Sequence, residues 1–481
     1  MKITDKVFQS LYTWGDHPAY IELLPDNSCV YTSAGQLKER INESRNFLKK
    51  SGIEKNYIVA FFLGNSVDFV SIFLALMDIG AKPIPMNLAY RKIELDEIFS
   101  NSGPHAVITE EPFLPLIMPY IERKIVIIRS NGKLTLHQSV KNKQAPAEID
   151  DSIASINYTY RGYGYPLGAM VPHSQYLMGA EVLEKGLKPK PGENMLAVLP
   201  LYYIFPMIGC LFVPLLNQMT SILSQTVNPL KLFKYIPQYK INIITAIPEI
   251  YELLFNCRDQ STDLSSLKSF VSGGSTLTKE NYHAIKEAFN VELLHGYGLT
   301  EFAPVSRNIR GQAKAGTIGP FCDGIEYKIS SADIKGHGEI LIKNPNMAKS
   351  YYRRNKETQE AFKDGWFKTG DIGRMEDDHL FFIKEKKNTR KLKGNMIDLE
   401  EVKKAILLYP NITDAIIDFK ENTLSAGIKI DTHKDMKDEY IKIKKFLSEI
   451  IAIYKVPKLT MSANDSWHLF CFLKGTEMQF F

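Results

Sequence analysis

The feature that most constrains the fold is a repeated alternation of short apolar runs with segments of helical periodicity. Residues Ile58–Leu63 form an unbroken apolar run that ends at a glycine, which predicts a buried strand and a turn. Asp68–Ile79 then has helical spacing and stops at Gly80, a typical helix end. A strand, a helix and a strand follow over residues 82–109. Strands that alternate with helices predict an α/β fold with largely parallel sheets.

The alternation resumes after residue 240 and brings glycine-rich turns to the ends of strands. The predicted elements are a strand at 241–246, a helix at 249–255, a strand at 269–272, a helix at 279–289 and a strand at 291–294. The last two strands lead to Gly273–Gly274 and to Gly296. Because ligand loops of open α/β sheets lie beyond the carboxyl ends of strands, these two turns are candidate ligand sites.

Residues 296–301, with the sequence GYGLTE, contain the side chains that a nucleotide triphosphate site needs. Glycine lets a backbone approach a ligand closely, and an aromatic face can stack on a base. A carboxylate beside a hydroxyl can hold a hard cation such as Mg²⁺. The alternative interpretation is an ordinary glycine-rich turn after a buried strand.

Length and composition exclude several classes of protein. A chain of 481 residues predicts two or more domains, and its 44% hydrophobic and 23% charged residues are those of an ordinary globular protein. The net charge of +5 is too mild to indicate a nucleic-acid partner. Five scattered cysteines without a CxxC pair predict reduced thiols rather than disulfides or a zinc site. Since the start of the chain also lacks the apolar core of a signal peptide, we expect a cytoplasmic protein.

One segment tests the expectation that the chain does not cross a membrane. Residues 195–216 carry no charged side chain and are long enough to span a bilayer. However, Pro200, Pro206 and Pro214 interrupt the segment, and proline breaks or kinks a helix. We therefore predict a buried strand, a loop and a core helix, without a transmembrane segment. Peripheral contact with a membrane stays open.

The composition changes near the C-terminal fifth of the chain. A basic, polar run over 384–394 predicts a solvated linker or surface loop. An amphipathic helix follows, capped by Asp398 and ended by Pro410. We predict a large N-terminal α/β domain of several subdomains over residues 1–386 and a small C-terminal α+β domain over 387–481.

Taken in order, these motifs resemble the adenylate-forming superfamily, which includes acyl-CoA synthetases, adenylation domains of peptide synthetases and luciferase-like enzymes. The matching segments are Gly64–Ile98, Ser272–Leu277, 296–301, Ala315–Pro320 and Ser350–Asp371. Among the subfamilies, the chain looks most like fatty acyl ligases. The resemblance implies two steps: a carboxylate attacks the α-phosphate of Mg-ATP, and a thiol then takes the acyl group from the acyl-adenylate.

The same resemblance implies cofactors and partners. The cofactors are ATP or AMP, Mg²⁺, and coenzyme A or a phosphopantetheine arm. The partners are a fatty or other apolar carboxylic acid and either coenzyme A or an acyl carrier protein. The small domain is expected to rotate about a hinge between the two steps.

By this resemblance, four residues hold the adenosine. Tyr297 is expected to stack on the adenine ring. Gly273 and Gly274 correspond to the turn that lies along the adenine edge. Asp371 corresponds to the carboxylate that accepts both ribose hydroxyls, which suits its two acceptor oxygens.

Other residues are assigned by the resemblance to the chemical steps. Thr300 corresponds to a hydroxyl that contacts phosphate, and Glu301 to the carboxylate that binds Mg²⁺. Lys391 corresponds to the lysine of the segment that turns toward the active site for thiol transfer; the alternative is a basic surface loop. Lys474 is the nearest candidate for the lysine that drives adenylation.

Three residues are expected to line the acyl pocket. Gly296 and Gly298 lie in the nucleotide motif, and Tyr203 stands where the family often has a histidine. The apolar and aromatic run behind Tyr203 is consistent with a hydrophobic acid, and equally with plain core.

The phosphate loop departs from the family pattern. The family loop is rich in hydroxyls and contains one lysine, whereas here Thr159 is the hydroxyl that remains and Leu167 replaces the lysine. Gly164 retains the turn. Arg161 is a new cation whose planar fork can bind phosphate oxygens bidentately. The loop is therefore either rebuilt around Arg161 or has lost ATP.

Two functions are compatible with these residues. The first is an AMP-forming acid–thiol ligase of fatty acid metabolism with altered phosphate handling. The second is a degenerate member that no longer adenylates and instead binds an acyl chain, a nucleotide or a carrier protein, or uses different acyl chemistry. The motif residues Thr300, Glu301 and Asp371 favour the ligase; the changed phosphate loop and the acidic Glu385 near the hinge favour the second function.

Overall fold

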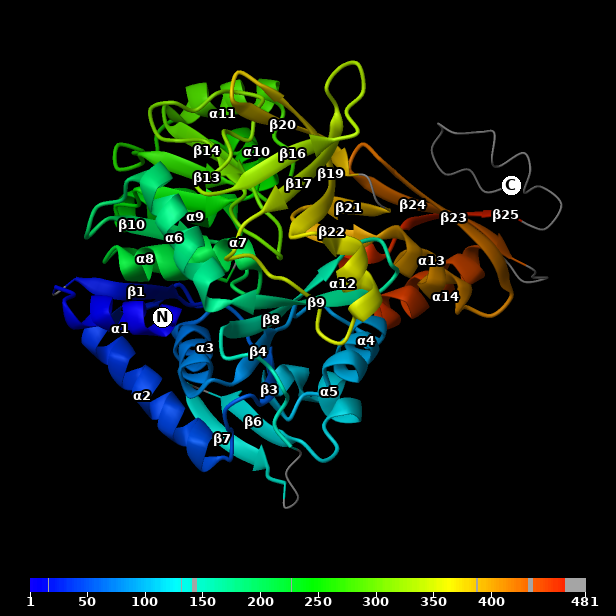
Figure 1. Ribbon diagram of the computed structural model, residues 1–481, viewed down its shortest axis with the longest axis horizontal. Helices are drawn as coiled ribbons and strands as arrows, with labels where there is room; N and C mark the ends of the chain where they lie inside the picture. The colour runs from blue at the N-terminus through cyan, green and yellow to red at the C-terminus, as the bar shows by residue number, and fades with distance from the viewer. Residues whose placement is uncertain are drawn as a thin grey trace. The chain divides into compact units, whose positions relative to one another are not determined.

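The computed structural model describes residues 1–15, 17–130, 132–140, 145–225, 227–385, 388–430 and 436–462. The chain folds into two compact units. Unit 1 comprises Met1–Leu88, Ser102–Tyr158 and Gly168–Lys384, and unit 2 comprises Ala89–Asn101, Thr159–Leu167 and the described residues from Glu385 (Figure 1). The domain boundary between residues 386 and 387 falls on two residues outside the described part and stays a prediction.

An eight-stranded sheet forms the centre of unit 1, in the order β15-β14-β13-β12-β10-β11-β1-β2. Its six central strands are parallel, and an antiparallel strand closes each edge. The strands are β1 (Pro18–Leu23), β2 (Cys29–Ser33), β10 (Asn194–Ala197), β11 (Thr220–Ser224), β12 (Ile243–Ala246), β13 (Ser269–Ser272), β14 (Glu292–Tyr297) and β15 (Ser306–Arg307). Every residue of β12 and β13 is buried, so these strands show no alternation of buried and exposed positions, as is typical of parallel strands covered on both faces.

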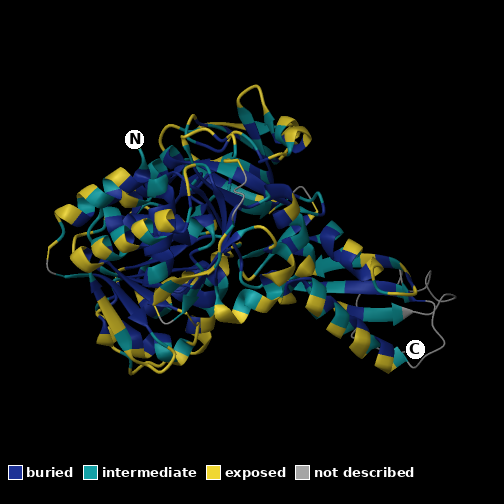
Figure 2. Ribbon diagram, turned by 90° about the horizontal axis from the view of Figure 1, so that it is seen from below, coloured by how far each residue is buried: buried dark blue, intermediate teal, exposed yellow. Residues whose placement is uncertain are grey.

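Helices pack against this sheet and close its core. They include α1 (Ile3–Tyr12), α6 (His173–Leu187), α9 (Pro229–Gln238), α10 (Pro248–Asn256) and α11 (Lys279–Phe289). Leu232 of α9, Tyr251 of α10 and Phe289 of α11 meet Phe270 of β13 in one buried cluster. Burial of each such side chain stabilises the fold by roughly 1.5–3 kcal/mol. Within the units, buried residues concentrate in the strands while the helices keep an exposed face (Figure 2).

A second sheet contains the first predicted strands, in the order β4-β3-β5-β6-β7. Its members are β3 (Ile58–Phe62), β4 (Lys82–Pro85), β5 (Ala106–Glu110), β6 (Ile125–Ser130) and β7 (Lys133–Gln138), of which β7 is antiparallel. Helix α3 (Val67–Ile79) packs against α2 (Ala34–Lys50). The Ser66 hydroxyl caps α3, and Gly80 ends it with a φ of +86°. That left-handed cap is the helix end that Gly80 predicts.

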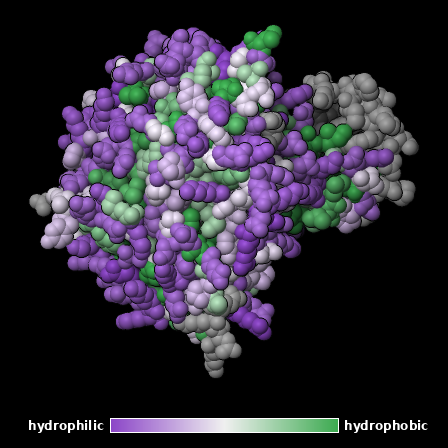
Figure 3. All heavy atoms as spheres, viewed as in Figure 1, coloured by the Kyte–Doolittle hydropathy of each residue, from purple (hydrophilic) through white to green (hydrophobic). Residues whose placement is uncertain are grey.

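A third, antiparallel sheet completes unit 1 and carries Asp371. It consists of β16 (Glu326–Ser330), β17 (Gly338–Lys343), β18 (Phe362–Lys363), β19 (Trp366–Glu376) and β20 (His379–Glu385). The visible surface of unit 1 is predominantly hydrophilic (Figure 3).

The uncharged segment 195–216 folds as the sequence predicts. Its first residues lie in β10, and Ile204–Leu216 form a buried helix that is π-helical over Met207–Phe212. Among the described residues, no helix combines the length and the apolar character that a membrane crossing requires.

Unit 2 contains an α+β core. Its elements are α4 (Lys92–Ser102, to Asn101 in this unit), β21 (Thr389–Leu392), β22 (Asn395–Asp398), α13 (Leu399–Leu407), β23 (Ile412–Lys420), β24 (Thr423–Ile430), α14 (Met436–Ile450) and β25 (Lys458–Ser462). Val402 and Ile406 of α13 pack with Ile428 of β24 and Ile443 of α14. The Asp398 carboxylate accepts hydrogen bonds from the amides of Glu400 and Glu401, which confirms the predicted cap.

The basic run before α13 is not the solvated linker or surface loop that its charge predicts. Of its described residues, Lys384 and Glu385 end β20, and Thr389–Leu392 form β21, which pairs with β22 as an antiparallel hairpin. The two residues of its turn, Lys393 and Gly394, have φ values of +49° and +76°. Two consecutive positive φ angles define the tight hairpin turn that matches strand twist, so local backbone geometry prevails over charge.

Candidate active site

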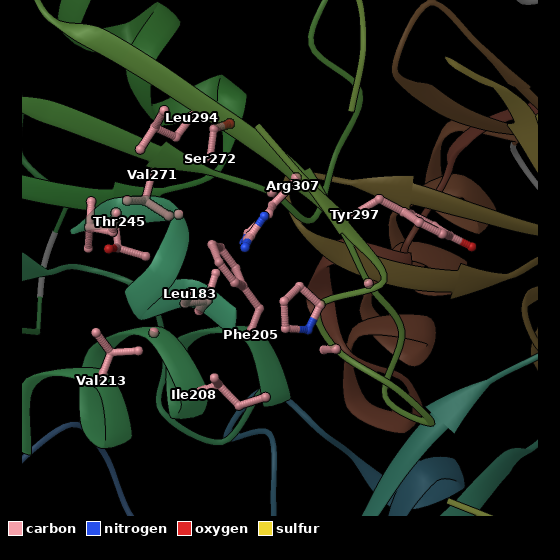
Figure 4. A pocket seen from close by; sticks show the side chains of 18 of the residues that line it. Leu183, Phe205, Ile208, Val213, Thr245, Val271, Ser272, Leu294, Tyr297 and Arg307 are labelled. Carbon is pink, nitrogen blue, oxygen red and sulfur yellow. The ribbon is translucent and has the colours of Figure 1, made fainter. Parts of the chain in front are cut away.

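A largely apolar cavity lies at the carboxyl ends of three parallel strands, β12, β13 and β14 (Figure 4). It holds about 820 Å³ of empty space, counting its open mouth. Thr245, Ser272 and Leu294 line it from these strands. On the other side lie Leu183 of α6 and the side chains Phe205, Ile208 and Val213 of the 204–216 helix. Such a position in an α/β sheet is typical of a ligand site.

The predicted pocket residues divide into two groups. Gly296 and Gly298 line the cavity, together with Gly273 and Gly274. Tyr203 is not among the lining residues: its hydroxyl accepts a hydrogen bond of 2.8 Å from the Asn87 amide. Phe205, two residues further along, lines the cavity instead. The assignment of Tyr203 to the acyl pocket therefore stays a prediction, whereas Phe205 is the aromatic of this segment that lines the cavity.

The turns after β13 and β14 lie close together. A Cβ on Gly273 would lie 3.4 Å from the Gly296 carbonyl oxygen and 3.5 Å from the Phe205 ring. Gly274 has a φ of +85°, a conformation that side chains rarely adopt. Strand β14 runs through Tyr297, three residues further than predicted, so the first two residues of the GYGLTE motif are strand rather than loop.

Tyr297 and Asp371 meet, although 74 positions separate them. The Tyr297 hydroxyl donates a hydrogen bond of 2.5 Å to Asp371 Oδ2, and both side chains are buried. Tyr297 lines the cavity, and its side chain points away from the cavity centre (Figure 4). The Asp371 amide donates to the Thr369 hydroxyl at 3.1 Å, which fixes the carboxylate on β19. An aromatic face and a carboxylate are therefore placed together beside the cavity.

Thr300 and Glu301 follow on the loop after β14. Glu301 is 1% exposed, and its carboxylate accepts a hydrogen bond from the Tyr351 hydroxyl. The Thr300 carbonyl accepts one of 3.0 Å from Gln175. The described residues contain no group of three His, Cys, Asp or Glu side chains arranged to hold a metal. A single carboxylate fits Mg²⁺ when phosphate oxygens and water supply the other ligands, which is the usual arrangement for that ion.

The predicted phosphate-loop residues belong to unit 2, whereas Tyr297, Glu301 and Asp371 belong to unit 1. Thr159 is half-buried, and Arg161 is 4% exposed. The loop connects β8 (Ile153–Tyr160) to β9 (Pro166–Pro172), which pair as a two-stranded sheet.

Within unit 2, the loop contacts the start of α13. The Gly164 amide donates a hydrogen bond of 3.0 Å to Asp398 Oδ2, the carboxylate that also caps this helix. Gly164 has a φ of +76°, and a Cβ there would lie 2.6 Å from Lys404 Nζ. The Lys404 ammonium lies 5.7 Å from the centre of the Tyr165 ring. An amide that a phosphate loop would offer to an anion is thus bound by a carboxylate of the same unit.

A buried charge network lies beside this loop. The Lys455 ammonium contacts the carboxylates of Glu401 and Glu94, the latter at 2.9 Å, and all three side chains are at most 1% exposed. The Tyr160 hydroxyl donates to Glu401 at 2.8 Å and accepts from Lys455 at 2.9 Å. Burial raises the pKa of Glu401, and Lys455 partly opposes this shift. The two carboxylates outweigh burial and raise the pKa of Lys455.

Of the two predicted catalytic lysines, one lies within the described residues. Lys391 lies on β21, partly exposed, and pairs with Met396 across the hairpin. Gly394 lies in the turn of the same hairpin. Lys474 lies outside the described residues.

Sequence reasoning missed Arg307 and the buried network. Arg307 stands in a polar stretch after the GYGLTE motif, and nothing local separates it from a surface arginine. Lys455 has a weak signal, since it interrupts an otherwise apolar run, but its partners come from three distant segments.

The cavity at the strand ends, with an aromatic–carboxylate pair beside it, is typical of a ligand-binding α/β protein. The chain belongs to the AMP-binding enzyme family, whose model matches residues 7–352. This confirms the resemblance to adenylate-forming enzymes.

Relatives share most of the chain at low identity. A 4-coumarate-CoA ligase from Narcissus pseudonarcissus is 24% identical, with 93% of this chain and 87% of the relative covered. A long-chain-fatty-acid–CoA ligase from Bacillus subtilis is 25% identical over 86% of this chain and 83% of its own length. The solved structure of o-succinylbenzoate CoA synthetase from Bacillus subtilis superposes with a TM-score of 0.82 at 20% identity, covering 96% and 94% of the two chains. The predicted fold, a large α/β domain with a small α+β domain, is confirmed.

Proposed function

We propose that this protein is an AMP-forming acid–thiol ligase that activates a carboxylic acid with a largely apolar body. The observation that carries the proposal is the buried Tyr297–Asp371 pair beside an apolar cavity at the strand ends. An adenosine site and an acyl site that share Tyr297 are what acyl-adenylate formation requires. The coenzyme A ligases among the relatives support the same reaction class.

In the first step, a carboxylate oxygen forms a bond to the α-phosphorus of ATP, and the bond to the pyrophosphate oxygen breaks. The apolar cavity holds the acid and excludes water from the mixed anhydride. Tyr297 offers its ring to adenine, and Asp371 offers acceptor oxygens to the ribose hydroxyls. Magnesium held by Glu301 would neutralise charge on the phosphates.

In the second step, a thiolate attacks the acyl carbonyl carbon, and AMP leaves with the bonding electrons. We assign the thiol to coenzyme A, with a carrier-protein arm as the alternative acceptor. Lys391 is a candidate for contact with the thiol-bearing molecule, because it is a partly exposed cation on the hairpin β21–β22. Arg161 is the candidate cation for the phosphates.

A second candidate function is acyl or nucleotide binding without adenylation. The specific observation in its favour is the Gly164 amide, which donates to Asp398 in unit 2. A loop whose amides are engaged by a carboxylate presents negative charge where a phosphate loop presents donors.

Pyrophosphate release with ATP and a panel of aliphatic and aromatic acids separates the two functions. The ligase predicts release that depends on the acid and disappears in Asp371→Ala. Binding of AMP without release by any acid would replace the ligase by the binding function. Absence of AMP binding would remove both assignments at Tyr297 and Asp371.

A further inference from the structure

Arg307 is the charged residue of the cavity, and the ligase mechanism above does not use it. All residues that line the cavity are described, and Arg307 alone among them carries a charge. The residue is 7% exposed, and its guanidinium points into the cavity, toward Phe205 (Figure 4). A cation in such a position requires a reason, because burial without a counter-ion is unfavourable.

The protein holds this guanidinium through one of its nitrogens. Nε donates a hydrogen bond of 2.7 Å to the Val182 carbonyl of α6. Among the described residues, no carboxylate pairs with Arg307, and no hydrogen bond involves its two terminal nitrogens. Because a guanidinium has five N–H donors, most of them remain directed at the cavity.

The position of the side chain is prepared by its surroundings. The Arg307 backbone pairs with Gly296 across β14–β15, and its amide donates to the Pro320 carbonyl at 3.2 Å. Gly186 of α6 leaves room for the side chain: a Cβ there would lie 2.9 Å from both Cδ and Nε of Arg307. Neither the backbone nor the stem of Arg307 can move without disturbing these contacts.

We propose that Arg307 recognises a second carboxylate on the acid substrate, so that the enzyme activates dicarboxylic acids whose body between the two carboxylates is apolar. This inference rests on the proposed function. The reacting carboxylate belongs at the Tyr297 side, where the adenosine pair lies, and the apolar walls fit the carbon skeleton between the two ends. A guanidinium fork matches a carboxylate through two parallel hydrogen bonds. An anion at this place also supplies the counter-ion that the described residues do not provide.

The test compares matched acids that differ in the second carboxylate alone. Suitable pairs are octanoic and suberic acid, decanoic and sebacic acid, and cinnamic and 4-carboxycinnamic acid. Binding is measured by calorimetry on the full-length protein in the presence of AMP, and turnover by pyrophosphate release. The wild-type protein is expected to bind one diacid at least about 10-fold more tightly than its monoacid.

Three variants locate this preference at Arg307. Arg307→Met should abolish the preference for the diacid, so that the two acids of a pair bind this variant with similar affinities. Arg307→Lys keeps the charge without the fork and should retain part of the preference. Gly186→Ala should weaken it by displacing the guanidinium. If Arg307→Met loses cooperative unfolding, the other two variants carry the comparison.

The outcomes for the inference and for the proposed function are separate. A preference for the monoacid in every pair overturns the inference, as does a diacid preference that survives in Arg307→Met. If Arg307→Met weakens the binding of both acids equally, the reacting carboxylate lies at Arg307, which also overturns the inference. Pyrophosphate release without diacid preference leaves the ligase intact and overturns the inference. Diacid preference in calorimetry without release from any acid removes the ligase and the activation of diacids, and leaves only the binding of the second carboxylate by Arg307.

Discussion

Two regions that the family resemblance predicts to act on one nucleotide differ in what their polar groups contact. In unit 1, Tyr297 and Asp371 are bonded to each other beside an apolar cavity. In unit 2, the phosphate loop is hydrogen-bonded to side chains of its own unit. The Gly164 amide donates to Asp398, and the Tyr160 hydroxyl donates to Glu401 and accepts from Lys455. The first region resembles a prepared ligand site, and the second a packed structural contact. The glycine turn of a phosphate loop can thus be retained while its donors acquire intramolecular partners.

The largest loss of stability is expected from a substitution in the buried charge network beside the phosphate loop. Lys455→Met removes the cation between Glu401 and Glu94 and leaves two buried carboxylates without it. Breaking a buried pair in this way destabilises a protein by about 3–5 kcal/mol. We expect the hydrogen-exchange protection of α13 and α14 in unit 2 to fall accordingly. Lys458→Met, an exposed lysine on β25, is the matched control and should leave protection unchanged.

Retained protection of α13 in Lys455→Met would contradict this prediction. It would mean that the two carboxylates take up protons readily, and that the network contributes little to the stability of unit 2.

The pH dependence should differ in sign between the two units. Burial raises the pKa of Glu401 from 4.5 to about 7, so folded unit 2 binds a proton that the unfolded chain releases. Stability of unit 2 from this group is therefore present below about pH 4.5 and is lost as the pH rises toward neutrality. Tyr160, Glu94 and Lys455 face the same carboxyl group. Glu401→Gln should abolish this slope.

His173, the first residue of α6 in unit 1, has the opposite behaviour. Burial lowers its pKa from 6.5 to about 4, so the stability it contributes is present above about pH 6.5 and lost as the pH falls toward 4. Hydrogen exchange of α6 and α13, measured from about pH 5 to about pH 8, resolves the two slopes. Parallel slopes in both helices would show that neither group governs its unit.

Substitutions beside the cavity should change the affinity for ligand rather than the stability of the fold. Asp371→Ala removes the acceptor of the Tyr297 hydroxyl and the carboxylate assigned to ribose. Loss of charge-assisted hydrogen bonds predicts about 10-fold to 100-fold weaker binding of AMP by calorimetry. Glu376→Ala, an exposed carboxylate on the same strand, is the control. Equal AMP affinity in Asp371→Ala and the wild-type protein would exclude the ribose assignment.

The two regions also differ in how far they can be predicted from sequence. Periodicity predicts α3 and its end at Gly80, because a local pattern and a local cap determine both. The assignment of Tyr297 and Asp371 to one adenosine site comes from the family resemblance alone, and their direct hydrogen bond was not predicted, since 74 positions separate them and no local pattern joins them.

The contacts of unit 2 were not predicted, for two physical reasons. Charge dominated the interpretation of residues 384–394, whereas the turn at Lys393–Gly394, with both φ angles positive, decides the structure. The network around Lys455 needs partners from α4, the phosphate loop and α13. A lysine in an apolar run indicates burial, but tertiary structure alone identifies the carboxylates that make such burial favourable.

The smallest expected difference in stability is between two glycine-to-alanine variants, which separate backbone strain from the contact of Gly164 with Lys404. Gly164→Ala places a methyl group at a φ of +76° and 2.6 Å from Lys404 Nζ. Strain at positive φ predicts about 1–2 kcal/mol of destabilisation. Gly192→Ala, at a φ of +79° with nothing within 4 Å, is matched for strain and lacks the contact. Because the end of a lysine side chain moves easily, the two variants should differ by well under about 1 kcal/mol in thermal unfolding. A much larger loss for Gly164→Ala would mean that its hydrogen bond to Asp398 is broken as well, and AMP and ATP affinities of that variant would then show whether the released amide serves phosphate.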